Sequence, residues 1–315
     1  MAVQMDMERR RMALVSKLYY EDDMTQQQIA KRLEVSRMKV SRMLQKAKNE
    51  GIVKVIIDYS GVYPELEQEL QEKYNLKEVI VVDTSFGGSS KEQVASAAAY
   101  YLENHLKAGA TVAVGWGLTI RQIPKYLKQV SDSTLTFSPI IGGHGQTELD
   151  MHASTIASRF AKQTGSKSLS LVAPALVDSE EEKKILHESE RIKDVLSCTA
   201  NAEYAVFSLG NPIVKGSSIS MSGYLSKENL QQLKEEDVIC DVVSITFLNR
   251  DSKECCENIT KRCIAITGEE LKAIPNKICV VEGADKKETV KAALNAGFID
   301  ILVIDEEIAG YLLEK

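Results

Sequence analysis

The chain has 315 residues, a length that favours two domains at roughly 150 residues per domain. Hydrophobic residues make up 44% and charged residues 27%, a composition that excludes a wholly disordered chain, a collagen or a coiled-coil rod. No apolar run reaches the ~18 residues that would span a bilayer. The first 15 residues lack the apolar stretch of a secretory signal. We therefore expect a cytoplasmic protein with no membrane partner.

The cysteines and histidines show no pattern of a metal site. None of the six cysteines belongs to a CxxC pair, and none of the four histidines to an HExxH motif. In a reducing compartment we expect free thiols, and the spacing fits no zinc site. We expect no structural metal and no cofactor. The residues are Cys198, Cys240, Cys255, Cys256, Cys263 and Cys279, and His105, His144, His152 and His187.

Charge is distributed unevenly along the chain, whose formal net charge is -6. Residues 1–58 hold 12 Lys/Arg against 8 Asp/Glu, a net charge of +4, whereas the remainder holds 27 against 37, a net charge of -10. A small basic segment before a large acidic one suits a nucleic-acid-binding domain on a body that phosphate repels. The alternative is a solvated, lysine-rich helix face.

The basic segment is predicted to form a series of helices. Apolar residues at helical spacing predict a helix over 9–20. Thr25, followed by Gln28, is a capping-box pattern that opens a second helix, which ends at residue 33. Ser36 caps a third helix, which Gly51 ends. The expected inward-facing residues are Met12, Val15, Leu18 and Tyr19, then Ile29, Ala30 and Leu33, then Val40, Met43, Leu44 and Ala47.

The spacing of these helices is typical of a helix-turn-helix. Ala30 supplies the small residue needed where the second and third helices cross. The turn requires a residue with positive φ, usually Gly or Asn, and this chain has Glu34 there, at a cost of about 1 kcal/mol. Residues 52–58 are β-branched and predict a strand or wing. The alternative is a generic three-helix bundle.

The outward positions of this domain, 1–58, supply the predicted DNA contacts. Arg and Gln side chains reach base edges, whereas Ser and Lys suit phosphates. We expect Arg37 and Arg42 to read bases. The predicted DNA-binding residues are Thr25, Gln26, Ser36, Arg37, Lys39, Ser41, Arg42 and Gln45.

The rest of the chain predicts an α/β domain. Residues 59–77 are expected to form a connector with an amphipathic, oligomerising helix that begins at Pro64. In 78–315, apolar strand-like runs alternate with helical stretches, which indicates a mostly parallel sheet covered on both faces. The expected strands are 78–83, 111–115, 135–141, 203–209, 277–283 and 300–305, and the expected helices 91–107, 117–129, 152–163, 179–197 and 286–296.

Glycines follow several of these strands. Ligands of open α/β sheets bind outside the carboxyl ends of the strands, and helix N-termini attract phosphate, so these loops favour an anion-binding cleft. The alternative is that strand-to-helix turns need glycine for backbone reasons. The chain has neither GxxxxGK[ST] nor GxGxxG. The residues are Gly115, Gly117 and Thr119, then Gly142 and Gly143, then Gly283 and Lys286.

Over nearly its whole length the sequence resembles the SorC family (DeoR-like) of bacterial transcriptional regulators. The resemblance implies a helix-turn-helix joined to a sugar-phosphate-binding domain similar to glucosamine-phosphate deaminases and ribose-phosphate isomerases. It also implies control of sugar-catabolism genes, a homo-tetramer (a dimer of dimers), operator DNA as partner and a phosphorylated sugar as effector. The stretches that carry it are LYYEDDMTQQQIAKRLEVSRMKVSRMLQKAKNEGIV, VAVGWGLTI, IIGGHG, MSGYLS, VICDVVSITF, VEGADKKETVKAAL and FIDILVIDEEIA.

The resemblance also assigns effector-binding residues by position. Asp241 matches an aspartate that contacts effector hydroxyls, although it could simply cap a turn. Lys286 ends the effector loop, although it could be a solvated helix-start lysine. His144 is expected to be a loop histidine and Trp116 a packing residue. The effector-binding residues implied by motif and resemblance are Gly115, Gly117, Thr119, Gly142, Gly143, Asp241, Gly283 and Lys286.

The chain departs from the family pattern at several of these positions. Glu282 replaces the first glycine of the loop that ends in Lys286, which adds negative charge beside the phosphate. Ile141 stands where the deoxyribose-phosphate regulator has a lysine that bonds the sugar covalently, so no Schiff base is expected. Further departures are Leu118 for threonine, Cys240 for glycine and Leu248 for aspartate. These differences leave the identity of the ligand open.

We predict a sugar-phosphate-responsive DNA-binding regulator, and not an enzyme. One alternative is a sugar-phosphate isomerase or deaminase, because the body resembles that enzyme fold, although fold does not fix function. The other is a helix-turn-helix adaptor that binds DNA without an effector.

Overall fold

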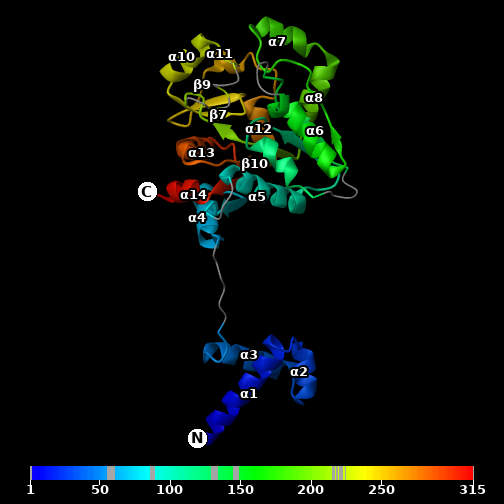
Figure 1. Cartoon of the computed structure of the whole chain (residues 1–315), viewed down its shortest axis with the longest axis vertical. Coiled ribbons are helices and arrows are strands. Elements are labelled where there is room, and N and C mark those ends of the chain that lie inside the picture. Colours follow the sequence, from blue (N-terminus) through cyan, green and yellow to red (C-terminus); the bar gives the residue numbers. More distant parts are fainter. Residues whose placement is uncertain are drawn as a thin grey trace. The chain divides into compact units, whose positions relative to one another are not determined.

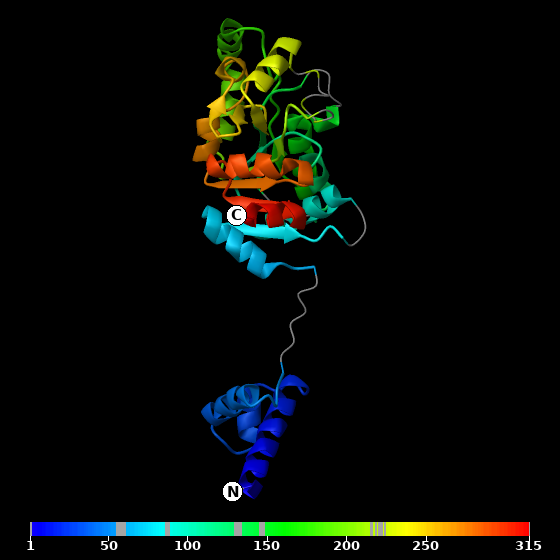
Figure 2. The same cartoon turned by 90° about the vertical axis from the view of Figure 1, so that its left-hand side faces the viewer.

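The structure is a computed structural model that divides into two compact units, Met1–Ser60 and Gly61–Lys315, drawn in Figures 1 and 2. None of the described helices is long and apolar enough to cross a bilayer. The described residues are 2–54, 61–85, 89–128, 134–144, 149–214, 217, 219, 223 and 225–314.

The smaller unit contains the predicted helix-turn-helix. Its helices are α1 (Ala2–Tyr20), α2 (Gln26–Arg32) and α3 (Arg37–Asn49). The first begins earlier than predicted, because residues 2–8 include Ala, Met, Gln and Glu, which favour a helix, and contain neither Gly nor Pro. The core that joins the helices is Val15, Leu18, Ile29, Ala30, Val40 and Leu44.

Two local predictions are confirmed, the capping box at the start of α2 and the positive φ in the turn after it. The Gln28 N–H donates to Thr25 Oγ1 at 3.3 Å, and the Thr25 N–H donates to Gln28 Oε1 at 2.9 Å, which completes the capping box. Glu34 has φ of +50°, so this chain places a glutamate in the left-handed region that favours glycine. The predicted strand over 52–58 is not present at residues 52–54, and 55–58 lie outside the described residues.

The larger unit is built on a seven-stranded sheet in the order β1-β11-β10-β5-β2-β3-β4. Every pairing in it is parallel, as predicted. Six strands correspond to the predicted runs, and the seventh, β4, is a two-residue edge strand too short to predict. The strands are β1 (Glu78–Val82), β2 (Thr111–Val114), β3 (Thr136–Pro139), β4 (Lys167–Ser168), β5 (Tyr204–Phe207), β10 (Asn276–Val280) and β11 (Ile301–Asp305).

Helices cover both faces of this sheet. Successive residues of a strand point to opposite faces, and in these strands both sets of residues are mostly apolar. One buried cluster joins strand residues such as Val114 and Val206 to α5 (Ser90–His105) and α6 (Ala153–Thr164). The other joins Ala113 and Phe207 to helices of the opposite face. Those helices include α8 (Glu190–Ala200), α13 (Lys287–Asn295) and α14 (Glu306–Leu313).

The predicted connector helix belongs to the body. This helix, α4 (Pro64–Tyr74), lies alongside β1 in Figure 2. Leu70 is fully buried in the core of the larger unit, and Glu67 accepts a 2.9 Å hydrogen bond from the Val81 N–H. The helix predicted as a connector thus packs its apolar side on the larger unit, and its role in oligomerisation stays a prediction.

A second, antiparallel sheet was not predicted. Its order is β6 (Leu209–Gly210), β7 (Val238–Val242), β8 (Thr246–Asn249) and β9 (Glu254–Cys255). All five residues of β7 are buried, so the strand lacks the alternation of a half-exposed strand. The turn into β8 uses Val243 (φ +54°) and Ser244 (φ +63°), where such turns usually carry Gly or Asn.

Several helix predictions need correction. The expected helix over 117–129 is only a 3₁₀ helix, η1 (Ile120–Lys125), with Pro124 inside it, because proline removes a helix hydrogen bond. The expected helix over 179–197 is two helices, α7 (Glu180–His187) and α8. The other elements are η2 (Leu149–Met151), α10 (Lys227–Glu235), α11 (Glu257–Thr260), α12 (Gly268–Ala273) and η3 (Ala284–Lys286).

Candidate effector pocket and nucleic-acid interface

A pocket of about 310 Å³ lies where three neighbouring parallel strands end. Strand β5 pairs with β2 on one side and β10 on the other. The segments that follow these strands therefore meet, and they bring Gly117, Ser208 and Glu282 into one wall. This is the place where open α/β sheets bind ligands. The polar and glycine lining is Lys91, Gly117, Thr119, Ser208, Gly210, Asn211, Ser217, Asp241, Glu282, Asp285 and Lys286.

Four of the eight predicted effector residues line this pocket: Gly117, Thr119, Asp241 and Lys286. Gly117 has φ of +120°, a conformation that side-chain-bearing residues rarely adopt. The chain can therefore turn back after β2 and carry Thr119, which is 3% exposed, to the pocket wall.

The other four predicted glycines do not line the pocket in this structure. A Cβ on Gly142 would lie 2.5 Å from the Ala173 carbonyl oxygen, and the Gly143 N–H donates to the same oxygen at 2.9 Å. Gly115 donates its N–H to Val206, and Gly283 to Asp305. Close backbone packing, the alternative noted from the sequence, accounts for glycine at 142.

Asp241 both caps a turn and faces the pocket. It lies on β7, and its Oδ1 accepts a 2.6 Å hydrogen bond from the Ser244 N–H. Burial raises the pKa of this carboxyl to about 7, and the Ser244 hydrogen bonds oppose that rise only in part. Near neutral pH the group is therefore divided between its acid, a donor, and its carboxylate, an acceptor.

Among the described residues that line the pocket, Lys286 is one of two cations. Its Nζ lies 4.0 Å from Glu282 Oε1, and Lys91 Nζ lies 3.4 Å from the same oxygen. No motif in the sequence pointed to Lys91. This residue lies in the first turn of α5, where a lysine normally faces solvent. Its proximity to Glu282 depends on the strand order β1-β11-β10, which the sequence does not show.

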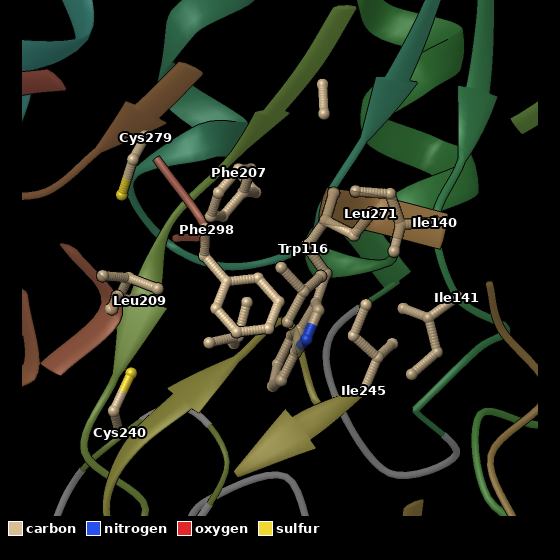
Figure 3. Packing of buried hydrophobic residues seen from close by; sticks show 14 of the residues in the cluster. Trp116, Ile140, Ile141, Phe207, Leu209, Cys240, Ile245, Leu271, Cys279 and Phe298 are labelled. Atoms are coloured by element: carbon tan, nitrogen blue, oxygen red, sulfur yellow. The ribbon is translucent and has the colours of Figure 1, made fainter. Parts of the chain in front are cut away.

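Trp116 is a buried packing residue, as predicted, and His144, predicted to be a loop histidine, packs against it. Their rings stack with centroids 3.8 Å apart, and His144 is fully buried. Burial, with a smaller contribution from His152, lowers the pKa of His144 to about 3, so its ring is neutral. Figure 3 shows Trp116 in the buried cluster near Phe298 and Ile245. Trp116 is 6% exposed and is one of the residues that line the pocket.

One group of possible metal ligands lies away from the pocket. A carboxylate oxygen of Glu236 and the Sγ atoms of Cys255 and Cys256 lie within 4.8 Å of one another. Burial raises the pKa of Cys255 to about 11 and that of Cys256 further. Both thiols are therefore protonated near neutral pH, a state that does not favour metal binding. The Glu236 carboxylate already accepts the Cys256 N–H.

The candidate nucleic-acid interface is the exposed side of α3. Ser36 caps this helix by accepting the Lys39 N–H at 3.2 Å, and the face that follows carries Arg37 and Arg42. Arg42 Nη2 lies 3.8 Å from the sulfur of Met38, which is 64% exposed. The predicted contacts Ser36, Arg37, Lys39, Ser41, Arg42 and Gln45 are all exposed, as is Thr25 on α2, whereas Gln26 is half-buried.

One basic residue of α3 is already paired. Lys46 Nζ lies 2.6 Å from Glu8 of α1 and 3.6 Å from Glu50. These carboxylates neutralise Lys46, whereas Arg37, Lys39 and Arg42 lie in the half of α3 that a helix-turn-helix places against base edges.

Comparison with known proteins matches a family to a region of each unit. Residues 63–314 match the family described as "Putative sugar-binding domain". The chain belongs to the SorC family of transcriptional regulators. Residues 8–49 match "Sigma-70, region 4", a helix-turn-helix region.

Individual members of the SorC family align over most or all of the chain. The sorbitol operon regulator of Klebsiella pneumoniae is 29% identical over 95% of this chain and 96% of its own. The structure of full-length SorC from that organism aligns with a TM-score of 0.75, at 27% identity, over 97% of this chain and 98% of that one.

Two further relatives align over much of the chain. A DeoR family transcriptional regulator from Listeria monocytogenes aligns with a TM-score of 0.72, at 34% identity, over 79% of this chain and 99% of that one. The deoxyribonucleoside regulator of Bacillus subtilis (strain 168) is 26% identical over 98% of this chain and 99% of its own.

Proposed function

We propose that this SorC-family protein regulates a carbohydrate-catabolism operon and that a phosphorylated sugar controls its binding to operator DNA. One observation carries the proposal. A polar pocket with two lysines lies at the carboxyl ends of three adjacent parallel strands, in a chain that also holds a helix-turn-helix. Relatives named as sorbitol operon and deoxyribonucleoside regulators support the carbohydrate link.

The pocket chemistry supports a phosphorylated effector. Lys91 and Lys286 supply ammonium groups for the phosphate, and Asp241, Asn211 and Ser208 supply hydrogen-bonding groups for sugar hydroxyls. A ligand that binds one arrangement of the protein more tightly than another shifts the population between them. Binding of the effector and of DNA are then linked by a coupling free energy.

The predicted DNA-binding residues support an operator-binding role for the smaller unit. Arg37 and Arg42 would read base edges, while Ser36, Lys39 and Ser41 contact phosphates. Thr25 and Gln26 lie at the start of α2, the helix that crosses the DNA backbone in such motifs.

We propose that the protein is a cytoplasmic homo-tetramer without enzymatic activity. Paired half-sites, which helix-turn-helix regulators bind, support an oligomer, and the relatives reported above are named as regulators. Light scattering coupled to size-exclusion chromatography measures the mass of the assembly. We expect the mass of four chains, and a monomeric or dimeric mass at micromolar concentration would contradict the tetramer.

A thermal-shift panel of sugars and their phosphates tests the effector assignment on the full-length protein. A ligand at 100 times its Kd adds about 2.7 kcal/mol to the free energy of unfolding. We expect at least one phosphorylated sugar to raise the melting temperature while its unphosphorylated form does not. Equal shifts with both members of every pair, or no shift with any of them, would contradict a phosphorylated effector.

A further inference from the structure

Glu282 lies between the two lysines of the pocket. Its Oε1 is 3.4 Å from Lys91 Nζ and 4.0 Å from Lys286 Nζ. Its other carboxylate oxygen, Oε2, accepts a 3.4 Å hydrogen bond from Ser90 Oγ. The Glu282 side chain is 12% exposed, so its charge is largely removed from water and depends on these partners.

The groups around Glu282 form a typical anion subsite. Ser90 and Lys91 are the first two residues of α5, a 16-residue helix, and the N-terminal end of a helix attracts negative charge. Lys286 comes from a different element, η3. Two ammonium groups, a hydroxyl and a helix N-terminus are the partners that a phosphate monoester prefers, and here a carboxylate of the chain holds them.

We propose that Lys91 and Lys286 together form the phosphate subsite of the effector pocket, and that Glu282 is an internal anion which occupies this subsite until the effector phosphate displaces it. The inference rests on the proposed function and deepens it in two ways. It adds Lys91 to the binding residues, and it gives Glu282 a role as a competitor of the phosphate.

The alternative position for Glu282 is beside the sugar, as a hydrogen-bond acceptor for a hydroxyl. The two roles predict opposite effects of removing the charge. A competitor weakens phosphate binding, so Glu282→Gln should strengthen it. An acceptor for the sugar strengthens binding of the sugar whether or not it is phosphorylated, so Glu282→Gln should weaken both forms.

Calorimetric titration of the full-length protein with inorganic phosphate tests the subsite without DNA. We expect Glu282→Gln to lower the Kd for phosphate about tenfold, which corresponds to about 1.4 kcal/mol. We expect Lys91→Ala to raise it about tenfold and Lys91→Arg to restore most of the loss. Glu190→Gln and Lys193→Ala are matched controls, because these residues form an exposed pair on α8, and both should bind phosphate as wild type does.

Three results would overturn the proposal: an unchanged or raised Kd in Glu282→Gln, an unchanged Kd in Lys91→Ala, or no phosphate binding by wild type and Glu282→Gln alike. Circular dichroism checks that each variant folds, and Lys91→Gln replaces Lys91→Ala if the latter does not. A failure of the proposed function can be distinguished from a failure of the phosphate subsite. If phosphate binding follows the expected order but no phosphorylated sugar changes DNA binding, the subsite stands and the regulatory role falls.

Discussion

The carboxylate of Asp241 accepts a 2.6 Å hydrogen bond from the Ser244 N–H, and the same side chain lines the effector pocket. The hydrogen bond stabilises the turn between β7 and β8, in which Ser244 has φ of +63°. Because this turn carries one wall of the pocket, the protonation state of Asp241 affects both the stability of the fold and the groups offered to the effector.

Replacement of Asp241 by asparagine should stabilise the protein at alkaline pH. Burial raises the pKa of Asp241 to about 7, whereas an unfolded aspartate titrates near 3.9. Between these values the folded state binds more protons, so the Asp241 contribution to the free energy of unfolding falls as pH rises from about 4 to 7. Asparagine keeps an acceptor for Ser244 and does not titrate.

We therefore expect the free energy of unfolding of Asp241→Asn to exceed that of wild type by about 1–3 kcal/mol at pH 8. This difference should shrink towards pH 4. Urea denaturation at both pH values measures it. Asp251→Asn, at an exposed position, serves as the control and should show little change. A stability difference of equal size at both pH values would show that Asp241 does not titrate in this range.

Arg42→Ala should weaken sequence-specific DNA binding. Arg42 lies exposed on α3, and loss of a bidentate arginine–base contact costs about 1–3 kcal/mol. Binding to DNA selected from a random pool should weaken more than binding to unrelated DNA. Lys46→Ala is the matched control, because Glu8 and Glu50 already neutralise Lys46. Equal affinity of Arg42→Ala and wild type for the selected DNA would remove Arg42 from base readout.

Lys286→Ala should separate effector response from DNA binding. Its side chain lines the pocket and is 19% exposed, while the predicted DNA contacts belong to the other unit. We expect the concentration of phosphorylated sugar that gives half of the maximal change in DNA binding to rise about tenfold. This corresponds to a loss of about 1.4 kcal/mol in the free energy of effector binding. Affinity for DNA without effector should stay unchanged. An identical effector titration for variant and wild type would exclude Lys286 from the site.

Gly142→Ala should destabilise the larger unit. The new methyl group would lie 2.5 Å from the Ala173 carbonyl oxygen and 2.6 Å from that of Pro174, so the backbone must move, at about 1–3 kcal/mol. Gly310→Ala, in helix α14 with open space around the added Cβ, is the control and should be neutral or slightly stabilising. Thermal unfolding of both variants measures the difference. A Gly142→Ala protein as stable as wild type would mean that packing does not require glycine there.

The helix-turn-helix could be predicted from the sequence in detail because its signals are local. The Thr25–Gln28 capping box and the positive φ at Glu34 each depend on a few neighbouring residues. The parallel strands were likewise marked by continuous apolar runs. The antiparallel sheet was missed because β7 is buried on both faces and its turn uses Val243 and Ser244, without the glycine or asparagine that marks such turns.

The pocket could be predicted only in part, because its members come together through strand order. Gly117 and Lys286 follow apolar strands, so the sequence pointed to them. Lys91 meets Glu282 only because the sheet places α5 beside the end of β10, and no local pattern records that. Gly142 and Gly143 had the same local signal as Gly117 but pack against Ala173 instead.

Fluorescence anisotropy of labelled DNA with the full-length protein tests the central claim most directly. DNA selected from a random pool by the protein is titrated with and without the phosphorylated sugar that gives the largest thermal shift. We expect that sugar to change the Kd for DNA by at least about fivefold, while its unphosphorylated form leaves it unchanged. A DNA affinity that stays constant at saturating phosphorylated sugar would contradict effector control of DNA binding.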